Sequence, residues 1–164
     1  MRARQPIELQ TVREVASLLI PLNGEMLLVP NVTVAEIVPF GQVVPHSDSP
    51  DWYLGDFNWR EQSVPLLAFE TLNGGARPSV DSRGRIAVLN CTGVSDSLYF
   101  IALLTQGIPR LARVNDEEIQ LREGVQKRPF DLMPVSWAGE EAVIPDVASL
   151  EKACLDYLAS RGDK

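Results

Sequence analysis

The sequence has few of the residues from which metal sites and nucleophilic active sites are built. It contains one histidine, His46, and two cysteines, Cys91 and Cys154, in 164 residues. Catalytic serines and cysteines usually need a histidine base, and zinc sites usually need several cysteine or histidine ligands. We therefore expect no catalytic set, no metal and no cofactor. We interpret His46, in a proline-rich loop, as a surface residue without a role, and Cys154 as a small core residue.

Long hydrophobic runs and an excess of positive charge are also missing. No apolar run reaches the roughly 20 residues that span a bilayer, and residues 1–15 lack the apolar stretch of a signal peptide. Acidic residues outnumber basic ones, 22 to 15, which gives a net charge of -7. Nucleic acids and anionic membranes select for basic patches, so we expect neither as the main partner. Because there is no disulfide framework either, the sequence favours a cytoplasmic protein that does not insert into a membrane.

What the sequence does contain is many short apolar runs separated by turn residues. They predict β-hairpins over residues 17–29, 85–104 and 134–144, and two more strands over residues 57–69 with a turn at 60–62. Residues 32–38 fit either a short helix or a strand. Near the end, Asp146 can cap a helix with Leu150 and Cys154 in line, which stops at Gly162. Many short strands with one terminal helix favour small β-barrels in a chain of one-domain size.

Three features that could carry chemistry have simpler explanations. Carboxylate pairs at residues 116–118 and 140–141 lie in expected turns, where solvated charge is the usual state. The glycine-rich run at residues 73–75 lacks the lysine of a phosphate-binding loop. A small hydrolase that uses acidic residues therefore ranks third among our functional hypotheses, after the two binding functions given below. Trp59, next to Arg60, fits either a core position or a partner-binding anchor, because both residue types are enriched at the centres of interfaces.

Residues 55–69 resemble the signature of CheW-like domains, the adaptors of bacterial chemosensory arrays. The family pattern is a glycine, two mostly apolar residues, Asn-Leu-Arg-Gly, and then Gln-Val-Val-Pro-Val-Ile-Asp-Leu. Six residues of this chain fall in register with it: Gly55, Asn58, Arg60, Gln62, Val64 and Pro65. Upstream, residues 34–37 resemble the family's Val-x-Glu-Ile element. Downstream, residues 98–104 and 143–146 resemble later elements, in the right order.

The resemblance covers roughly residues 16–160, with residues 1–15 as an N-terminal arm and residues 161–164 as a tail. It implies a mainly β fold of two interlocked, SH3-like five-stranded β-barrels with a C-terminal helix. Members of the family are not enzymes. They join the cytoplasmic tip of a chemoreceptor to the regulatory domain of a CheA-like histidine kinase.

The resemblance also implies which residues meet a partner. The partner-binding residues carried over from the family are Val34, Glu36, Asn58 and Arg60, with Trp59 as a flanking anchor. Gly55 and Pro65 are expected to shape the turn.

In four places the chain departs from the family pattern: Trp59 replaces a leucine, Glu61 a glycine, and Ala68 and Thr105 an aspartate each. Because glycine usually supplies a positive-φ turn, Glu61 is expected to reshape the turn. Residues 105–111 resemble CheW-like proteins of the ChpC type, which are linked to type IV pili and twitching motility. The expected function is a chemosensory adaptor recruited to membrane-associated arrays. The alternative is an SH3-like protein-binding module in a pilus-related pathway, without direct kinase coupling.

Overall fold

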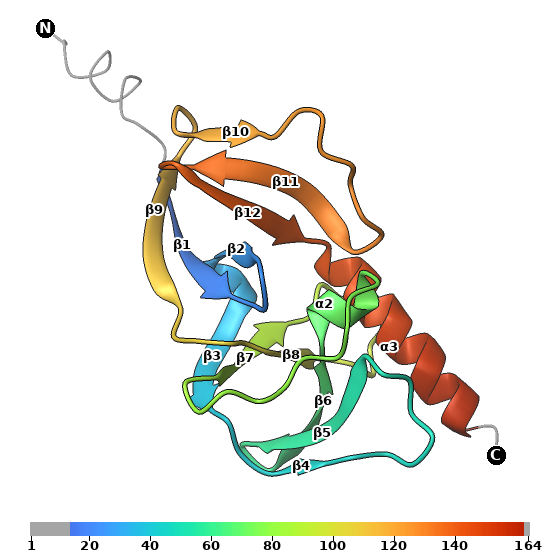
Figure 1. Ribbon diagram of the computed structural model, residues 1–164. Helices are drawn as coiled ribbons and strands as arrows, with labels where there is room; N and C mark the ends of the chain where they lie inside the picture. The colour runs from blue at the N-terminus through green and yellow to red at the C-terminus, as the bar shows by residue number, and fades with distance from the viewer. Residues whose placement is uncertain (1–13, 163–164) are drawn as a thin grey trace, which may run out of the picture.

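The structure is a computed structural model that describes residues 14–162, in which two β-sheets are flanked by a long C-terminal helix (Figure 1). The expected N-terminal arm and C-terminal tail fall mostly outside these residues. Where they overlap the described part, Glu14 and Val15 belong to the first strand, and Arg161 and Gly162 belong to the last helix.

The first sheet joins the two ends of the chain. Its strands are β1 (Glu14–Pro21), β2 (Met26–Pro30), β9 (Arg110–Asn115), β10 (Ile119–Leu121), β11 (Asp131–Trp137) and β12 (Glu140–Pro145). They lie in the order β10-β11-β12-β2-β1-β9. The hairpins β1–β2 and β11–β12 are the first and third predicted from the sequence, and both are antiparallel. Strand β12 pairs with β2 in parallel, so the C-terminal strands complete a sheet that the N-terminal strands begin.

The second sheet is built from the middle of the chain. Its strands are β3 (Val34–Pro39), β4 (Val43–Val44), β5 (Tyr53–Trp59), β6 (Gln62–Leu67), β7 (Arg85–Asn90) and β8 (Phe100–Leu104). They lie in the order β3-β7-β8-β6-β5-β4. The predicted pairs β5–β6 and β7–β8 are both present. The chain leaves the first sheet after β2, builds this sheet and returns at β9, so the two units are interlocked (Figure 1).

Three helical segments complete the described part of the chain: η1 (Asn31–Thr33), α2 (Phe69–Leu72) and α3 (Val147–Gly162). Helix α3 begins where the sequence predicts, because the side chain of Asp146 accepts a hydrogen bond from the backbone N–H of Ser149 at 3.1 Å. Gly162 lies within the helix rather than after it. None of the helices in residues 14–162 has the length and apolar character that crossing a membrane requires.

The mainly β fold with two sheets and a C-terminal helix is confirmed. Each sheet has six strands where five-stranded barrels were expected, and the additions include the very short β4 and β10. Residues 32–38, left open between helix and strand, form the end of η1 and most of β3. The four-residue helix α2 was missed, since so short an element leaves no periodic pattern.

The buried residues form three clusters. The largest lies between the sheets and α3 and includes Tyr53, Phe69, Leu150 and Cys154. A second cluster lies on the second sheet and a third on the first sheet, as expected for two barrels that each enclose side chains. Cys154 is fully buried, which confirms its predicted core position. Burial also raises the pKa of its thiol to about 12, so it is a packing residue rather than a nucleophile.

Candidate functional site

The two-residue turn between β5 and β6 carries the centre of the family signature. Trp59 pairs with Gln62, which leaves Arg60 and Glu61 as the two central turn residues. Their φ angles are 51° and 65°, the left-handed conformation required at both positions of a type I′ hairpin turn. Glu61 therefore adopts the backbone that the motif glycine favours. The expectation that Glu61 reshapes the turn is wrong, because the hairpin imposes this conformation on a residue that disfavours it.

Three of the predicted partner-binding residues meet at this turn. One carboxylate oxygen of Glu36, on β3, accepts hydrogen bonds from the Trp59 indole N–H at 2.8 Å and from the Arg60 guanidinium at 3.1 Å. The side chains of Arg60 and Glu36 are 65% and 39% exposed. Strand β3 is one edge of the second sheet and β5 lies near the other, so this cluster closes the barrel with side chains. The cluster of Glu36, Trp59 and Arg60 is hereafter the Glu36 cluster.

Trp59 lies in the core and not on the surface. It is 6% exposed, and its ring packs edge-on against Phe100 with 4.8 Å between centroids. The guanidinium of Arg60 lies 4.9 Å from the centroid of the Trp59 ring. The structure therefore favours the core alternative for Trp59, and its expected role as a flanking anchor stays a prediction. From the core side, Trp59 orients Glu36 through its indole N–H and Arg60 through its ring.

The structure does not bring Asn58 and Val34 into the Glu36 cluster. Side chains alternate along β5, so Asn58 is exposed between two buried neighbours, Phe57 and Trp59. It lines a shallow depression whose other residues include Val44 and Glu61. Val34 is half-buried against the core between the sheets, and a register shift separates it from Glu36 on β3.

Gly55 and Pro65 lie away from the turn that they were expected to shape. A Cβ atom on Gly55, whose φ is 142°, would lie 2.6 Å from the backbone oxygen of Val44. Gly55 therefore allows β4 to approach β5. Pro65 is buried in the middle of β6, opposite Asp56.

His46 is not the surface residue without a role that we expected. Its side chain is 10% exposed and lies 2.8 Å from the carboxylate of Asp56 through Nε2 and 2.9 Å from the hydroxyl of Tyr157 through Nδ1. The hydroxyl of Tyr53 donates to the other oxygen of Asp56. Burial, followed by this hydrogen bond to Asp56, raises the pKa of Tyr53 well above its usual range. We call these four residues the His46 cluster; it ties α3 to β5 and the loop before it.

A catalytic role for the His46 cluster lacks a nucleophile. The hydroxyl groups that contact His46 and Asp56 belong to tyrosines, and Tyr53 is 1% exposed. Proton-accepting triads act on a serine or cysteine that reaches a substrate. Within residues 14–162, no group of three or more acidic, histidine or cysteine side chains is arranged to hold a metal ion either. The arrangement can fasten α3 and order the loop, which are structural tasks.

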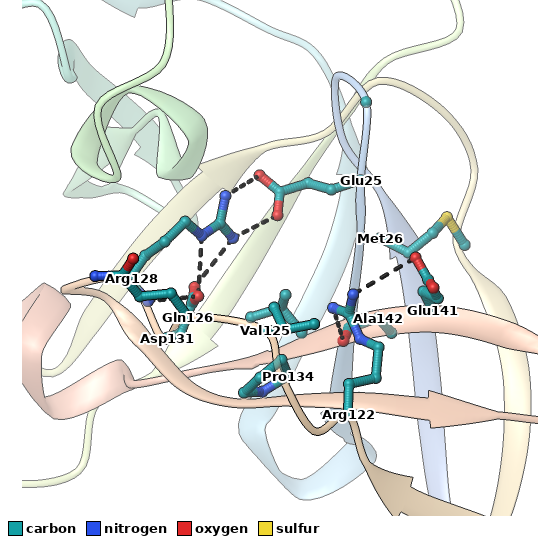
Figure 2. Close-up of a pocket in the computed structure, with 12 residues that line it drawn as sticks. Glu25, Met26, Arg122, Val125, Gln126, Arg128, Asp131, Pro134, Glu141 and Ala142 are labelled. Carbon is teal, nitrogen blue, oxygen red and sulfur yellow. Dashed lines mark hydrogen bonds and ion pairs between the residues drawn. The ribbon is translucent and has the colours of Figure 1, made fainter.

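Sequence reasoning also missed a charged pocket between β12, the β1–β2 hairpin and the loop before β11 (Figure 2). Its volume is about 300 Å³. The Arg128 guanidinium bonds to Glu25 at 2.6 Å and to Asp131 at 2.9 Å. Arg122 donates to the backbone oxygens of Val135 and Ala142, both at 3.0 Å. Both arginines are thus engaged within the protein, so they brace the pocket and do not offer an open anion site.

Comparisons with known proteins agree with the family resemblance on which the site was built. The CheW-like domain family matches residues 16–153. No curated protein matches the chain. Among solved structures it is similar to the scaffolding protein TtCheW from Thermoanaerobacter tengcongensis, with 14% identity and a TM-score of 0.69. That similarity covers 81% of this chain and 89% of the other, and at this identity it shows a shared fold. With the family match spanning most of its length, the chain belongs to the CheW-like domain family.

Proposed function

We propose that this protein is a non-enzymatic adaptor in chemotaxis-type signal transduction. It joins the cytoplasmic tip of a chemoreceptor to the regulatory domain of a CheA-like histidine kinase. The observation that carries the proposal is the CheW-like match over residues 16–153, within which Glu36 of the Val-x-Glu element and Arg60 of the signature turn lie together at the surface. The similar fold of a protein described as a scaffold also supports it.

The Glu36 cluster suits the recognition of a charged partner surface. Arg60 is fixed from one side by the Trp59 ring and from another by Glu36, yet 65% of its side chain is exposed. A guanidinium that is already oriented loses little conformational entropy when a partner carboxylate binds it. An arginine held in this way is therefore a good candidate for the central charged contact with a receptor tip.

An apolar groove near the start of β3 extends the proposed partner-binding surface beyond the Glu36 cluster. It has a volume of about 310 Å³ and is lined by residues that include Thr33, Leu132, Ile144 and Val147. The side chain of Leu132, which lines this groove, is 53% exposed. Val34 follows Thr33 directly, so this groove lies next to the Val-x-Glu element. A receptor tip that covers both would combine apolar burial with the charged contact at Arg60.

Binding to the receptor and to the kinase on two faces gives the adaptor its physical effect. A scaffold raises the effective concentration of one partner at the other, so contacts that are weak singly can hold an array together. To control the kinase it must also bind one kinase state better than another. Recruitment to membrane-associated arrays from the cytoplasm follows from the receptor contact, and a fluorescent fusion that stays diffuse in receptor-containing cells would contradict it.

Arg60→Glu tests the receptor contact. If Arg60 is the central charged contact, reversing its charge weakens receptor-tip binding by about 2 kcal/mol, which is roughly 30-fold in affinity. The matched control is Arg83→Glu in the loop before β7, because Arg83 is also exposed and also pairs with a carboxylate, Asp81. Both variants are checked for folding by circular dichroism. An Arg60→Glu protein that is folded and binds the tip normally removes Arg60 from the interface.

A second candidate is an SH3-like binding module in a pilus-related pathway, without direct kinase coupling. Thr105 favours it, because a family aspartate is replaced here by a buried residue with no charge. The Thr105 hydroxyl accepts from the Arg85 N–H at 3.0 Å and donates to the Gly107 oxygen at 2.9 Å, so it is used up within the fold. Pull-down with receptor tip and kinase regulatory domain separates the two candidates. Capture of neither, with capture of a pilus regulator, selects the second.

The link to type IV pili is the finer part of the proposal. It rests on residues 105–111, which resemble the ChpC type. We expect deletion of the gene to reduce twitching motility and to spare swimming. Restored twitching from a plasmid copy is the control, and a swimming defect alone assigns the protein to a flagellar pathway instead.

A further inference from the structure

A buried carboxylate on α2 is left half-paired. Glu70 is 6% exposed, and one oxygen accepts a hydrogen bond from the Asn23 N–H at 2.9 Å. Its other oxygen, Oε1, is buried and has no hydrogen-bond partner within the part of the chain that the structure describes. A buried carboxylate oxygen without a partner is costly, and native proteins keep few such groups.

Glu70 lines a pocket of about 430 Å³ at the tip of the β1–β2 hairpin. The other charged groups in the wall are already paired, since Arg128 binds Glu25 and Asp131. Both ends of the Asn73 amide are engaged as well, with Asp131 at 3.0 Å and with the Phe130 N–H at 2.9 Å. Among the charged and amide side chains of this wall, Glu70 is therefore the one with a carboxylate oxygen, Oε1, that no other group in the described part of the chain pairs with.

The surroundings of Glu70 define the chemistry of that group. It must donate a hydrogen bond, and positive charge is favoured because the carboxylates of Glu25 and Glu70 line the pocket with Arg128 as its one cation, which is also paired with Asp131. A divalent metal needs several oxygen ligands at once, and the Glu25 carboxylate is already held by Arg128. An apolar group would leave Oε1 unpaired. A guanidinium or ammonium group meets all of these requirements.

We propose that the pocket beside Glu70 binds a basic side chain, arginine or lysine, of a partner protein. The site is distinct from the Glu36 cluster, because their lining residues do not overlap. It stands independently of the adaptor function. The basic group forms its charge-assisted hydrogen bond with Oε1.

The test uses the full chain, labelled with ¹⁵N, and small probes in place of the unidentified partner. Acetyl-arginine methylamide, acetyl-lysine methylamide and the neutral isostere acetyl-citrulline methylamide are titrated while the amide signals of residues 73–76 and Asn23 are followed. We expect one basic probe to shift these signals and to bind at least about tenfold more tightly than citrulline, the loss expected for one charge-assisted bond. Glu70→Gln should weaken it by a similar factor, whereas Glu117→Gln, at an exposed turn, should not.

Several results overturn the proposal. Equal binding of citrulline and of both basic probes removes the role of charge, and unchanged binding to a folded Glu70→Gln protein removes Glu70. Shifts caused by calcium or magnesium, with none caused by the basic probes, assign the pocket to a metal. If Glu70→Gln does not fold, the wild-type protein is titrated with the better basic probe from pH 7 down to pH 4. Binding that does not weaken as the carboxylates take up protons then contradicts a carboxylate contact.

Discussion

Helices α2 and α3 each carry one buried glutamate. Among residues 14–162, only the glutamate on α3 has a hydrogen-bond partner for both carboxylate oxygens. Glu151 on α3 is fully buried, and its oxygens accept hydrogen bonds from the backbone N–H groups of Thr92 at 2.7 Å and Val94 at 3.4 Å. Glu70 on α2 is almost as buried, and Asn23 donates to one of its oxygens, but Oε1 has no hydrogen-bond partner among residues 14–162. Glu151 thus fastens a loop, whereas Glu70 keeps one carboxylate oxygen without a partner in the described part of the chain.

The same difference, between paired polar groups and unpaired or strained ones, recurs elsewhere in the molecule. On the α3 side the His46 cluster is closed in the same way as Glu151, since each polar group has a partner on another element. The β5–β6 turn resembles α2 in carrying one unfavourable residue, Glu61, which is held in the left-handed conformation. Strained or unpaired groups persist where function needs them. Substitutions on the α3 side should therefore lower stability, and substitutions that relieve Glu70 or Glu61 should raise it.

Glu151→Ala has the largest expected effect. It leaves the N–H groups of Thr92 and Val94 without their acceptor and opens a void under α3, so we expect the free energy of unfolding to fall by about 3 kcal/mol. Urea denaturation measures it. Glu117→Ala, at an exposed turn, is the matched control and should change stability by less than about 0.5 kcal/mol. A loss below about 1 kcal/mol at Glu151 would place it with Glu70 and end the comparison.

The hairpins and the terminal helix could be predicted from the sequence because their signals are local. Turn residues lie between alternating runs, and Asp146 directly precedes the helix that it caps. The closed clusters could not be predicted, because their members are far apart in the chain. His46 and Tyr157 are separated by 111 residues, and Glu151 and Thr92 by 59. No spacing rule connects such residues before the fold is known.

His46→Ala tests the second closed cluster, with a smaller expected effect. It removes the contacts with Asp56 and Tyr157 but leaves the hydrogen bond between Tyr53 and Asp56. We expect a loss of about 2 kcal/mol in the free energy of unfolding. Tyr157→Phe keeps the aromatic packing on Tyr53 and removes only the hydroxyl, so it should lose about 1 kcal/mol. If His46→Ala is as stable as the wild type in urea, the cluster does not fasten α3.

Glu70→Gln should have the opposite sign, and its effect should depend on pH. Burial raises the pKa of Glu70 in the folded protein above its ordinary 4.5, so the folded state holds this proton to a higher pH than the unfolded chain does. Stability from Glu70 is therefore complete below pH 4.5 and is lost as the pH rises through the raised pKa. At pH 7 we therefore expect Glu70→Gln to be more stable than the wild type.

The pH series contains its own control. Below pH 4.5 both proteins carry an uncharged side chain at residue 70, so their unfolding free energies should converge. Urea denaturation at several pH values measures the difference. A Glu70→Gln protein that is less stable at pH 7 would mean that the charge is compensated in solution, and Glu70 would then belong with Glu151.

The candidate site was half predictable for a related reason. Glu36 and Arg60 were identified through two separate elements of the resemblance, the Val-x-Glu element on β3 and the signature turn, and they do lie together. The resemblance could not tell which face of β5 each side chain occupies. Asn58 and Trp59 are neighbours in sequence, yet one is exposed and the other is buried against Phe100. Alternation along a strand assigns faces only when one buried residue is already known.

Glu61→Gly has the smallest expected effect and tests whether the β5–β6 turn carries an unfavourable residue, as α2 does. Glycine removes the cost of a side chain at φ 65°, while the greater freedom of the unfolded chain offsets part of the gain, so we expect a net increase of about 0.5 kcal/mol in unfolding free energy. Gln62→Gly is the matched control, because the next residue is an exposed strand position where glycine should destabilise by a similar amount. Equal losses of unfolding free energy for both variants would mean that the side chain of Glu61 stabilises the protein by at least as much as the strained backbone destabilises it. The turn would then be a finished structural element, and of the two only α2 would carry an unfavourable residue.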